Sequence, residues 1–252
     1  ARFVSEWLSA DTNACRHLMI AAMPEIWAAS GYRAVPEGLA FGGVRPGQEP
    51  DAARLVEENR RFRKAVLPLL VGTDNHESPS DALREWLRMR LGFTANELGV
   101  FLEESGKFET AYQVYEDAVE TDSKNISAAI NVYGVAVSKK LNPEAYDRLR
   151  GRVKKLMAGR KWTPQTLAGV RQVCGSIRDS SVYQREAALW ASSGARAVAD
   201  DKLKKALALS EQLGATSLSG KGVCYLQMGD RERAETFFRD ALAADASDRD
   251  AL

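Results

Sequence analysis

Residues 98–118 read LGVFLEESGKFETAYQVYEDA, and the rest of the chain is interpreted from this stretch. Its apolar residues recur at the spacing of amphipathic helices on both sides of a Ser–Gly pair. They are Leu98, Phe101 and Leu102 before the pair, and Ala111, Val114, Tyr115 and Ala118 after it. Gly106 lets the chain reverse with little steric penalty. The stretch therefore predicts two short helices folded against each other as a hairpin.

Several residues of this hairpin stand at the spacings of a known helical repeat. They are Leu98, Gly99, Leu102, Gly106, Ala111, Tyr115 and Ala118. In these residues the stretch resembles the tetratricopeptide repeat (TPR), a unit of about 34 residues. The resemblance implies an all-α fold, in which TPR-like helical hairpin repeats form a right-handed superhelix. It also implies a binding scaffold rather than a catalyst.

A second close match to the TPR pattern stands near the end of the chain. It consists of Leu218, Gly222, Tyr225, Gly229, Ala234, Phe238, Ala241 and Asp245. Two well-matched repeats that bracket degenerate ones are typical of a repeat array. We therefore expect a TPR-like helical repeat domain over residues 93–252.

The repeat that follows the first one is degenerate. Residues 127–137 resemble its first helix, with Gly134 in the place of Gly99 but one residue later than strict repetition would put it. The partner helix, at residues 143–157, has Tyr146 where the family usually has alanine. The pattern therefore predicts a hairpin with an altered register.

The number of true repeats between residues 140 and 215 is left open. Ala206 stands twelve residues after Gly194, as Ala111 stands twelve residues after Gly99. This alignment predicts that the register shortens before the last repeat, with a tight or unusual linking turn.

Residues 1–92 are predicted to form a separate, mostly helical N-terminal region. Helical patterns at residues 1–30 and 51–71 flank an irregular but ordered loop at residues 31–50, in which a short hairpin is considered. Gly92 is expected to separate the last helix of this region from the repeats. A further hypothesis makes the region a ligand-binding unit, with a pocket lined by Trp27, Tyr32, Val35 and Phe41.

Charge and hydropathy narrow the classes of partner. Lysine and arginine nearly balance aspartate and glutamate, for a formal net charge of +1, so no global field attracts nucleic acid or a membrane surface. No apolar run approaches the ~20 residues that span a bilayer. We expect no nucleic-acid partner and no membrane insertion by this chain.

The cysteines and the first residue bear on the cellular setting. Cys15, Cys174 and Cys224 are odd in number and form no CxxC motif, so we expect buried, inert thiols. The sequence starts at Ala1 rather than methionine, which raises the hypothesis of a processed chain or a fragment. Localisation is left open between the cytoplasm and the soluble part of a membrane-associated or exported protein.

Local charge is uneven although the total is balanced. Residues 97–122 are mostly acidic and residues 139–161 mostly basic, which we interpret as neighbouring repeats that complement each other. The alternative is a basic patch for an acidic partner segment. A further basic group at residues 60–64 is interpreted as a solvated helix face rather than a nucleic-acid site.

The sequence holds no constellation of catalytic or metal-binding residues. The two histidines, His17 and His76, lie in different segments. No HExxH, CxxC, phosphate-binding loop or Gly-x-Ser-x-Gly motif is present. We therefore predict no catalytic residue, no metal site and no cofactor.

The resemblance to the TPR family implies a peptide-binding groove lined by the first helix of each repeat. The implied residues are Asn96, Val100, Glu103, Asn131, Val135, Ser138, Ser219, Val223 and Leu226. Asn96 and Val100 stand where a basic clamp for a C-terminal carboxylate would need lysine and asparagine, which argues against such a clamp. Asn96 and Asn131 are expected to face an open surface and to bind peptide backbone. The alternative is that they brace neighbouring turns.

These observations predict a protein–protein interaction scaffold that binds a peptide or a helix in a concave groove, and not an enzyme. Its partner is expected to be another protein or peptide, and its oligomeric state is left open. The alternative hypothesis is a soluble accessory domain of a larger protein, for example a membrane-anchored one, or of an enzyme whose catalytic part lies upstream.

Overall fold

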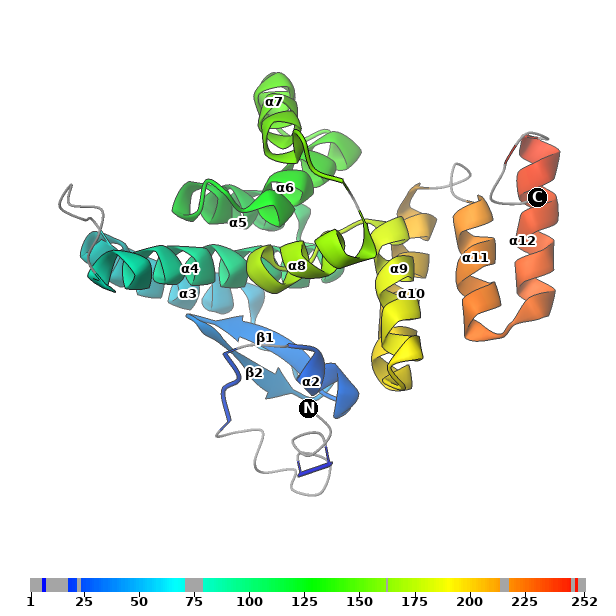
Figure 1. The fold of residues 1–252 in the computed structure, drawn as a ribbon, viewed down its shortest axis with the longest axis horizontal. Helices are drawn as coiled ribbons and strands as arrows, with labels where there is room; N and C mark the ends of the chain where they lie inside the picture. The colour runs from blue at the N-terminus through cyan, green and yellow to red at the C-terminus, as the bar shows by residue number, and fades with distance from the viewer. Residues whose placement is uncertain are drawn as a thin grey trace. The chain divides into compact units, whose positions relative to one another are not determined.

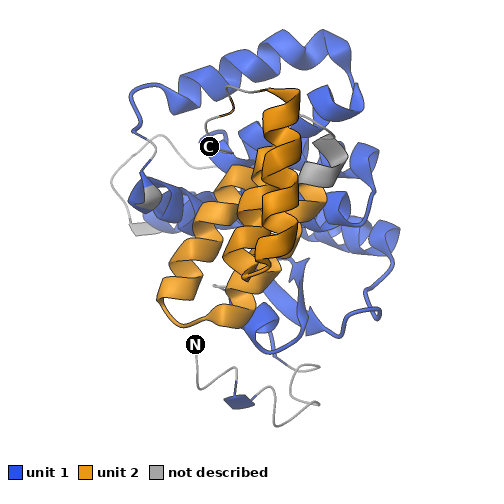
Figure 2. Ribbon diagram, turned by 90° about the vertical axis from the view of Figure 1, so that its right-hand side faces the viewer, with its two compact units in different colours: residues 1–177 blue, residues 178–252 orange. Residues whose placement is uncertain are grey.

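The computed structural model describes residues 6–7, 18–21, 24–70, 79–161, 163–213, 218–245 and 248. The chain divides into two compact units, unit 1 (residues 1–177) and unit 2 (residues 178–252), which Figure 2 shows in different colours. The all-α repeat fold predicted above is confirmed. The superhelical stacking of all repeats, and the independent folding of residues 1–92, stay predictions.

Unit 1 combines one β-hairpin with a series of helices (Figure 1). Its elements are α2 (Glu25–Ala29), β1 (Arg33–Glu37), β2 (Ala40–Val44), α3 (Ala52–Val66), the 3-10 turn η2 (Leu67–Leu70), α4 (Pro79–Glu104), α5 (Phe108–Thr121), α6 (Ile126–Lys139), η3 (Pro143–Ala145), α7 (Tyr146–Met157) and α8 (Pro164–Cys174). Unit 2 consists of α9 (Ser180–Ser192), α10 (Arg196–Leu213), α11 (Leu218–Met228) and α12 (Arg231–Ala244).

The stretch predicted as an irregular loop contains the antiparallel hairpin β1–β2, in line with the short hairpin considered there. Arg33 pairs with Val44 and Glu37 with Ala40. The indole Nε1 of Trp27 donates to the Phe41 carbonyl at 3.1 Å. Trp27, Tyr32, Val35 and Phe41 do not line a pocket as expected. All four side chains are buried and belong to packed hydrophobic clusters.

Gly92 does not separate two helices as expected, because α4 runs through it without a break. A Cβ at this position would lie 2.7 Å from the Cβ of Asp122, at the end of α5. The absence of a side chain at Gly92 therefore allows α4 and the end of α5 to approach each other closely. From sequence alone, such a packing glycine cannot be distinguished from a glycine that ends a helix.

Four helical hairpins share the same turn after their first helix. The last residue of the turn has a positive φ, and the next N–H donates to the carbonyl five residues earlier, at 2.8–2.9 Å. This is a Schellman-type helix end, which satisfies carbonyls that the helix leaves unpaired. The positive-φ residues are Gly106, Lys140, Gly194 and Gly229.

These turns define the true repeat register. Lys140 lies 34 residues after Gly106, and Gly229 lies 35 residues after Gly194. Five residues after each turn stands an alanine that is at most 6% exposed, in the seam between the two helices. These alanines are Ala111, Ala145, Ala199 and Ala234.

The register corrects the predictions for the degenerate repeats. Ala145, not Tyr146, holds the alanine position of the second repeat. Gly194 corresponds to Gly106 rather than to Gly99, so Ala206 corresponds to Ala118 and the register does not shorten before the last repeat. The error came from matching glycines by type, because Lys140 takes the left-handed turn position without being glycine.

Close packing in the first and last repeats depends on a glycine opposite an aromatic ring. A Cβ at Gly99 would lie 2.4 Å from the ring of Tyr115, and one at Gly222 would lie 2.5 Å from the ring of Phe238. A Cβ at Gly134 would have nothing within 4 Å, so Gly134 does not take the role of Gly99. The two repeats that match the family best are therefore built alike.

Candidate peptide-binding face

The predicted groove residues of α4 and α6 are covered by the chain itself. Asn96 is 0% and Asn131 2% exposed, which contradicts the expectation that both amides face an open surface. The cover is α8, which packs against α4 and α6, together with residues 175–177 that follow it. We call the side of α4 and α6 that carries Asn96, Glu97, Ser127 and Asn131 the inner face of unit 1.

The inner face holds the backbone of Ser176 and Gly175 by side-chain hydrogen bonds. The Ser176 carbonyl accepts from Nδ2 of Asn96 at 3.0 Å and from Nδ2 of Asn131 at 2.9 Å. The Gly175 carbonyl accepts from the Ser127 hydroxyl at 2.8 Å. Asn131 also donates to Oδ1 of Asn96 at 2.9 Å, so the two amides form one network.

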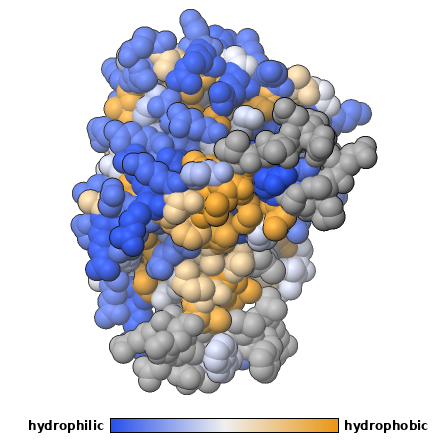
Figure 3. All heavy atoms as spheres, turned by 90° about the vertical axis from the view of Figure 1, so that its left-hand side faces the viewer, coloured by the Kyte–Doolittle hydropathy of each residue, from blue (hydrophilic) through white to orange (hydrophobic). Residues whose placement is uncertain are grey.

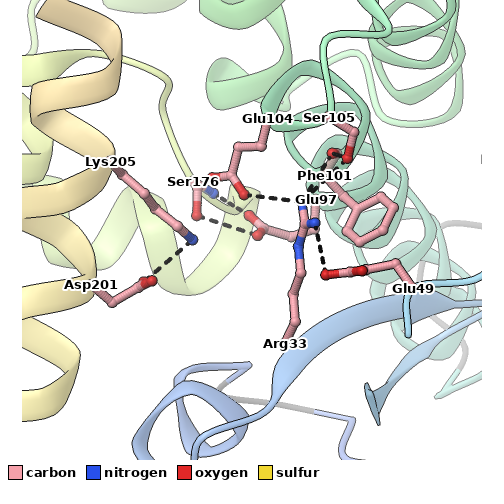
Figure 4. A network of polar contacts seen from close by, with 9 residues as sticks. All are labelled: Arg33, Glu49, Glu97, Phe101, Glu104, Ser105, Ser176, Asp201 and Lys205. Carbon is pink, nitrogen blue, oxygen red and sulfur yellow. Dashed lines mark hydrogen bonds and ion pairs between the residues drawn. The ribbon is translucent and has the colours of Figure 1, made fainter. Parts of the chain in front are cut away.

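Glu97 binds Ser176 from the other side of the same segment. The Ser176 N–H donates to one carboxylate oxygen, and the Ser176 hydroxyl donates to the other at 3.3 Å. Figure 4 shows the Glu97 carboxylate pointing at Ser176. Ser176 is thus held at its N–H, its carbonyl and its hydroxyl.

The segment fits only because residue 175 is glycine. Gly175 has φ +88° and ψ −171°, a conformation that residues with a side chain rarely adopt. A Cβ there would also lie 2.6 Å from the Glu97 carboxylate and 2.7 Å from Nδ2 of Asn96. Gly175 therefore meets a backbone requirement and a space requirement together.

The other predicted groove residues of unit 1 have different surroundings. Val100 and Val135 are buried in the main hydrophobic cluster. Glu103 is also buried, and its carboxylate accepts from the Tyr115 hydroxyl at 2.9 Å. Ser138 is exposed, and its hydroxyl donates to the Val135 carbonyl of its own helix. Of the predicted groove residues of unit 1, the structure thus brings Asn96 and Asn131 together by a direct hydrogen bond.

Sequence reasoning missed Glu97, Ser127, Gly175 and Ser176. One signal was present in the spacing, since Gly194 lies 54 residues after Lys140, about 20 more than one repeat. The extra residues contain α8 and the segment 175–177. An insertion of that length between two repeats indicates an element outside the repeat pattern, but not where it packs.

The predicted groove residues of unit 2 remain accessible. Leu226 is 51% exposed, and Ser219 and Val223 are half-buried. Gln184 of α9 stands ten residues before Gly194, as Asn96 stands ten residues before Gly106. Its amide donates to the Gly220 carbonyl at 3.2 Å and contacts the Cys224 sulfur at 3.4 Å. We call the side of α9 and α11 with Gln184, Ser219, Val223 and Leu226 the inner face of unit 2.

Ion pairs join neighbouring helices where the sequence showed complementary charge. Arg148 of α7 pairs with Glu116 of α5 at 2.9 Å. Arg60 and Arg63 of α3 pair with Asp117 at 3.1 and 2.7 Å, so this basic group meets an acidic residue of the first repeat. Within unit 2, Lys202 and Glu186 form a buried pair at 3.0 Å.

The described cysteines are free and buried, as expected for inert thiols. Cys174 belongs to α8 and Cys224 to α11. Burial raises the pKa of the Cys174 thiol, and it raises the pKa of Cys224 to about 11. A thiol with so high a pKa forms little of the reactive thiolate at neutral pH. Cys15, His17 and His76 lie outside the described residues.

Other surface features of the described residues carry no recognised chemistry. Within them, no group of three or more His, Cys, Asp and Glu side chains is placed to hold a metal ion. None of the described helices combines the length and the apolar character needed to cross a membrane. Figure 3 shows a face where apolar surface gathers between hydrophilic surface. Among the exposed apolar side chains of unit 1 are Leu69, Leu83 and Trp86.

Comparison with known proteins confirms the resemblance seen in the last repeat. Residues 215–248 match the family model of the tetratricopeptide repeat. No curated protein matches the chain. Repeats of this family are typically non-enzymatic scaffolds for protein–protein interaction, and the match is consistent with a helical repeat fold whose other repeats are degenerate.

The buried amide network leads to a prediction about stability. Changing Asn96→Ala and Asn131→Ala together removes both donors to the Ser176 carbonyl and leaves a buried acceptor unpaired. We expect unit 1 to lose about 2 kcal/mol, since an unsatisfied buried group costs about 1–3 kcal/mol. Chemical denaturation measures the loss. Ser138→Ala is the control, and an equally small change in both variants would contradict the burial of the amides.

Proposed function

We propose that this chain is a non-enzymatic scaffold whose inner faces bind the backbone of an extended polypeptide segment. The observation that carries the proposal is the binding of Ser176 by Asn96 and Asn131 in unit 1. The contact has the chemistry expected of a peptide groove, in which amides from adjacent first helices bind one carbonyl. Because it uses backbone atoms, the same chemistry suits segments of varied sequence.

In unit 2 the corresponding face is the candidate site for a partner. Gln184 stands at the register position of Asn96, and Ser219 adds a hydroxyl on the adjacent first helix. Val223 and Leu226 add apolar surface, and the side chain of Leu226 is 51% exposed. A polar group beside accessible apolar side chains is the composition of a site that binds backbone and one aliphatic side chain. The proposed partner is therefore an extended peptide segment of another protein.

Peptide selection from a random library tests this proposal. Peptides enriched on the wild-type chain are expected to bind the Leu226→Arg variant at least tenfold more weakly, because a charge replaces the apolar contact. Ala243→Arg, at an exposed position of α12, is the matched control and should bind them unchanged. The proposal fails if no peptide is enriched, or if the enriched peptides bind both variants equally.

A further inference from the structure

Residues 175–177 bind to unit 1 in the manner of a ligand. They lie in the insertion between the second and third repeats, and they follow α8 without helical or strand structure. Both Ser176 and Ile177 are at most 6% exposed. The segment is thus a buried stretch of chain that belongs to no repeat.

The contacts of this segment specify what the inner face accepts. Three backbone groups are bound by side chains, namely the Gly175 carbonyl and the N–H and carbonyl of Ser176. The first position must be glycine, because a Cβ would overlap Glu97 and Asn96. The second position presents a hydroxyl to the Glu97 carboxylate. These requirements describe a Gly–Ser segment whose glycine has a positive φ.

We propose that the inner face of unit 1 is a specific binding site for a Gly–Ser segment of another polypeptide, with residues 175–177 as its resident competitor. The inference rests on the proposed function for the idea of backbone recognition, but it concerns unit 1 alone. Its polar groups need no partner from the chain when the site is open, because water can satisfy Asn96, Asn131 and Glu97. Exchange of one segment for another therefore leaves no buried group unpaired.

Competition from residues 175–177 weakens the apparent affinity of a segment added in trans. A tethered ligand acts at an effective concentration in the millimolar range. The apparent dissociation constant of a free segment equals its intrinsic value divided by the fraction of sites that the tethered segment leaves open. A change that prevents residues 175–177 from binding should therefore tighten the binding of the same sequence added in trans.

A synthetic peptide tests the proposal. It carries the sequence of residues 171–179, with serine in place of Cys174 to prevent oxidation, and a fluorescent label for anisotropy. We expect it to bind the Gly175→Val chain at least tenfold more tightly than the wild type. The same peptide with valine at its Gly175 position should bind neither chain, and adding Glu97→Ala to Gly175→Val should abolish binding.

The outcomes separate a binding site from a purely structural contact. Equal binding of the peptide to wild type and to a Gly175→Val chain with unchanged circular dichroism would overturn the proposal. So would equal binding of the glycine and valine peptides. If Gly175→Val does not fold, the wild type is titrated with millimolar peptide while the side-chain amide signals of Asn96 and Asn131 are followed. Saturable shifts support the site, and unchanged signals overturn it; the selection experiment on unit 2 is unaffected by either result.

Discussion

Replacing Glu186 by leucine is expected to destabilise unit 2 by about 3–5 kcal/mol, because the change removes one side of the buried Glu186–Lys202 ion pair. Both side chains are less than 10% exposed, and Lys202 also lies over the Tyr183 ring at 5.3 Å. Hydrogen exchange, read separately for α9 and α10, measures the loss.

The repeat register supplies the matched rescue. Glu186 and Lys202 stand at the positions that Leu98 and Val114 occupy in the first repeat, where both residues are apolar and buried. The double change Glu186→Leu with Lys202→Met should therefore recover stability to within about 1 kcal/mol of the wild type, or exceed it, as is common when an apolar pair replaces a buried ion pair. If the double variant is no more stable than Glu186→Leu alone, the proposed equivalence of the two hairpins is wrong.

The second large effect is expected at Gly99. A Gly99→Ala change places a Cβ 2.4 Å from the Tyr115 ring, which is fully buried and hydrogen-bonded through its hydroxyl to Glu103. Because the ring has no room to move, we expect a loss of about 3 kcal/mol in the free energy of unfolding, at the upper end of overpacking costs.

The control for Gly99 should change stability in the opposite direction. Gly134→Ala adds a methyl group in the middle of α6 where nothing lies within 4 Å, so it should stabilise the helix by about 0.5–1 kcal/mol. Thermal or chemical denaturation of both variants measures the difference. If both changes destabilise the protein, Gly134 is a packing glycine equivalent to Gly99, as the sequence pattern predicted.

The parts of the fold that could be predicted are those that depend on patterns of residues close in sequence. Apolar stripes, the Gly99–Tyr115 spacing and the Gly106 turn identify the first hairpin because each depends on residues close in sequence. The second hairpin was misaligned because Lys140 adopts the left-handed conformation normally marked by glycine, while Gly134 resembled a packing glycine without being one.

The candidate site could be predicted only in part, because half of it comes from distant sequence. The amides of Asn96 and Asn131 were found through the resemblance to the repeat family. Their ligand atom is the carbonyl of Ser176, 80 and 45 residues further along the chain. No local pattern fixes where an inserted helix such as α8 packs, so the burial of both amides follows only from the folded structure.

The central claim is that the inner face of unit 1 binds the backbone of Gly175 and Ser176. It is tested most directly by hydrogen exchange at the side-chain amides of Asn96 and Asn131, measured by nuclear magnetic resonance. We expect slow exchange in the wild type and in Gly159→Ala, a positive-φ glycine with nothing within 4 Å of its added Cβ, and fast exchange in Gly175→Ala. Fast exchange in the wild type, or slow exchange in Gly175→Ala, would contradict it.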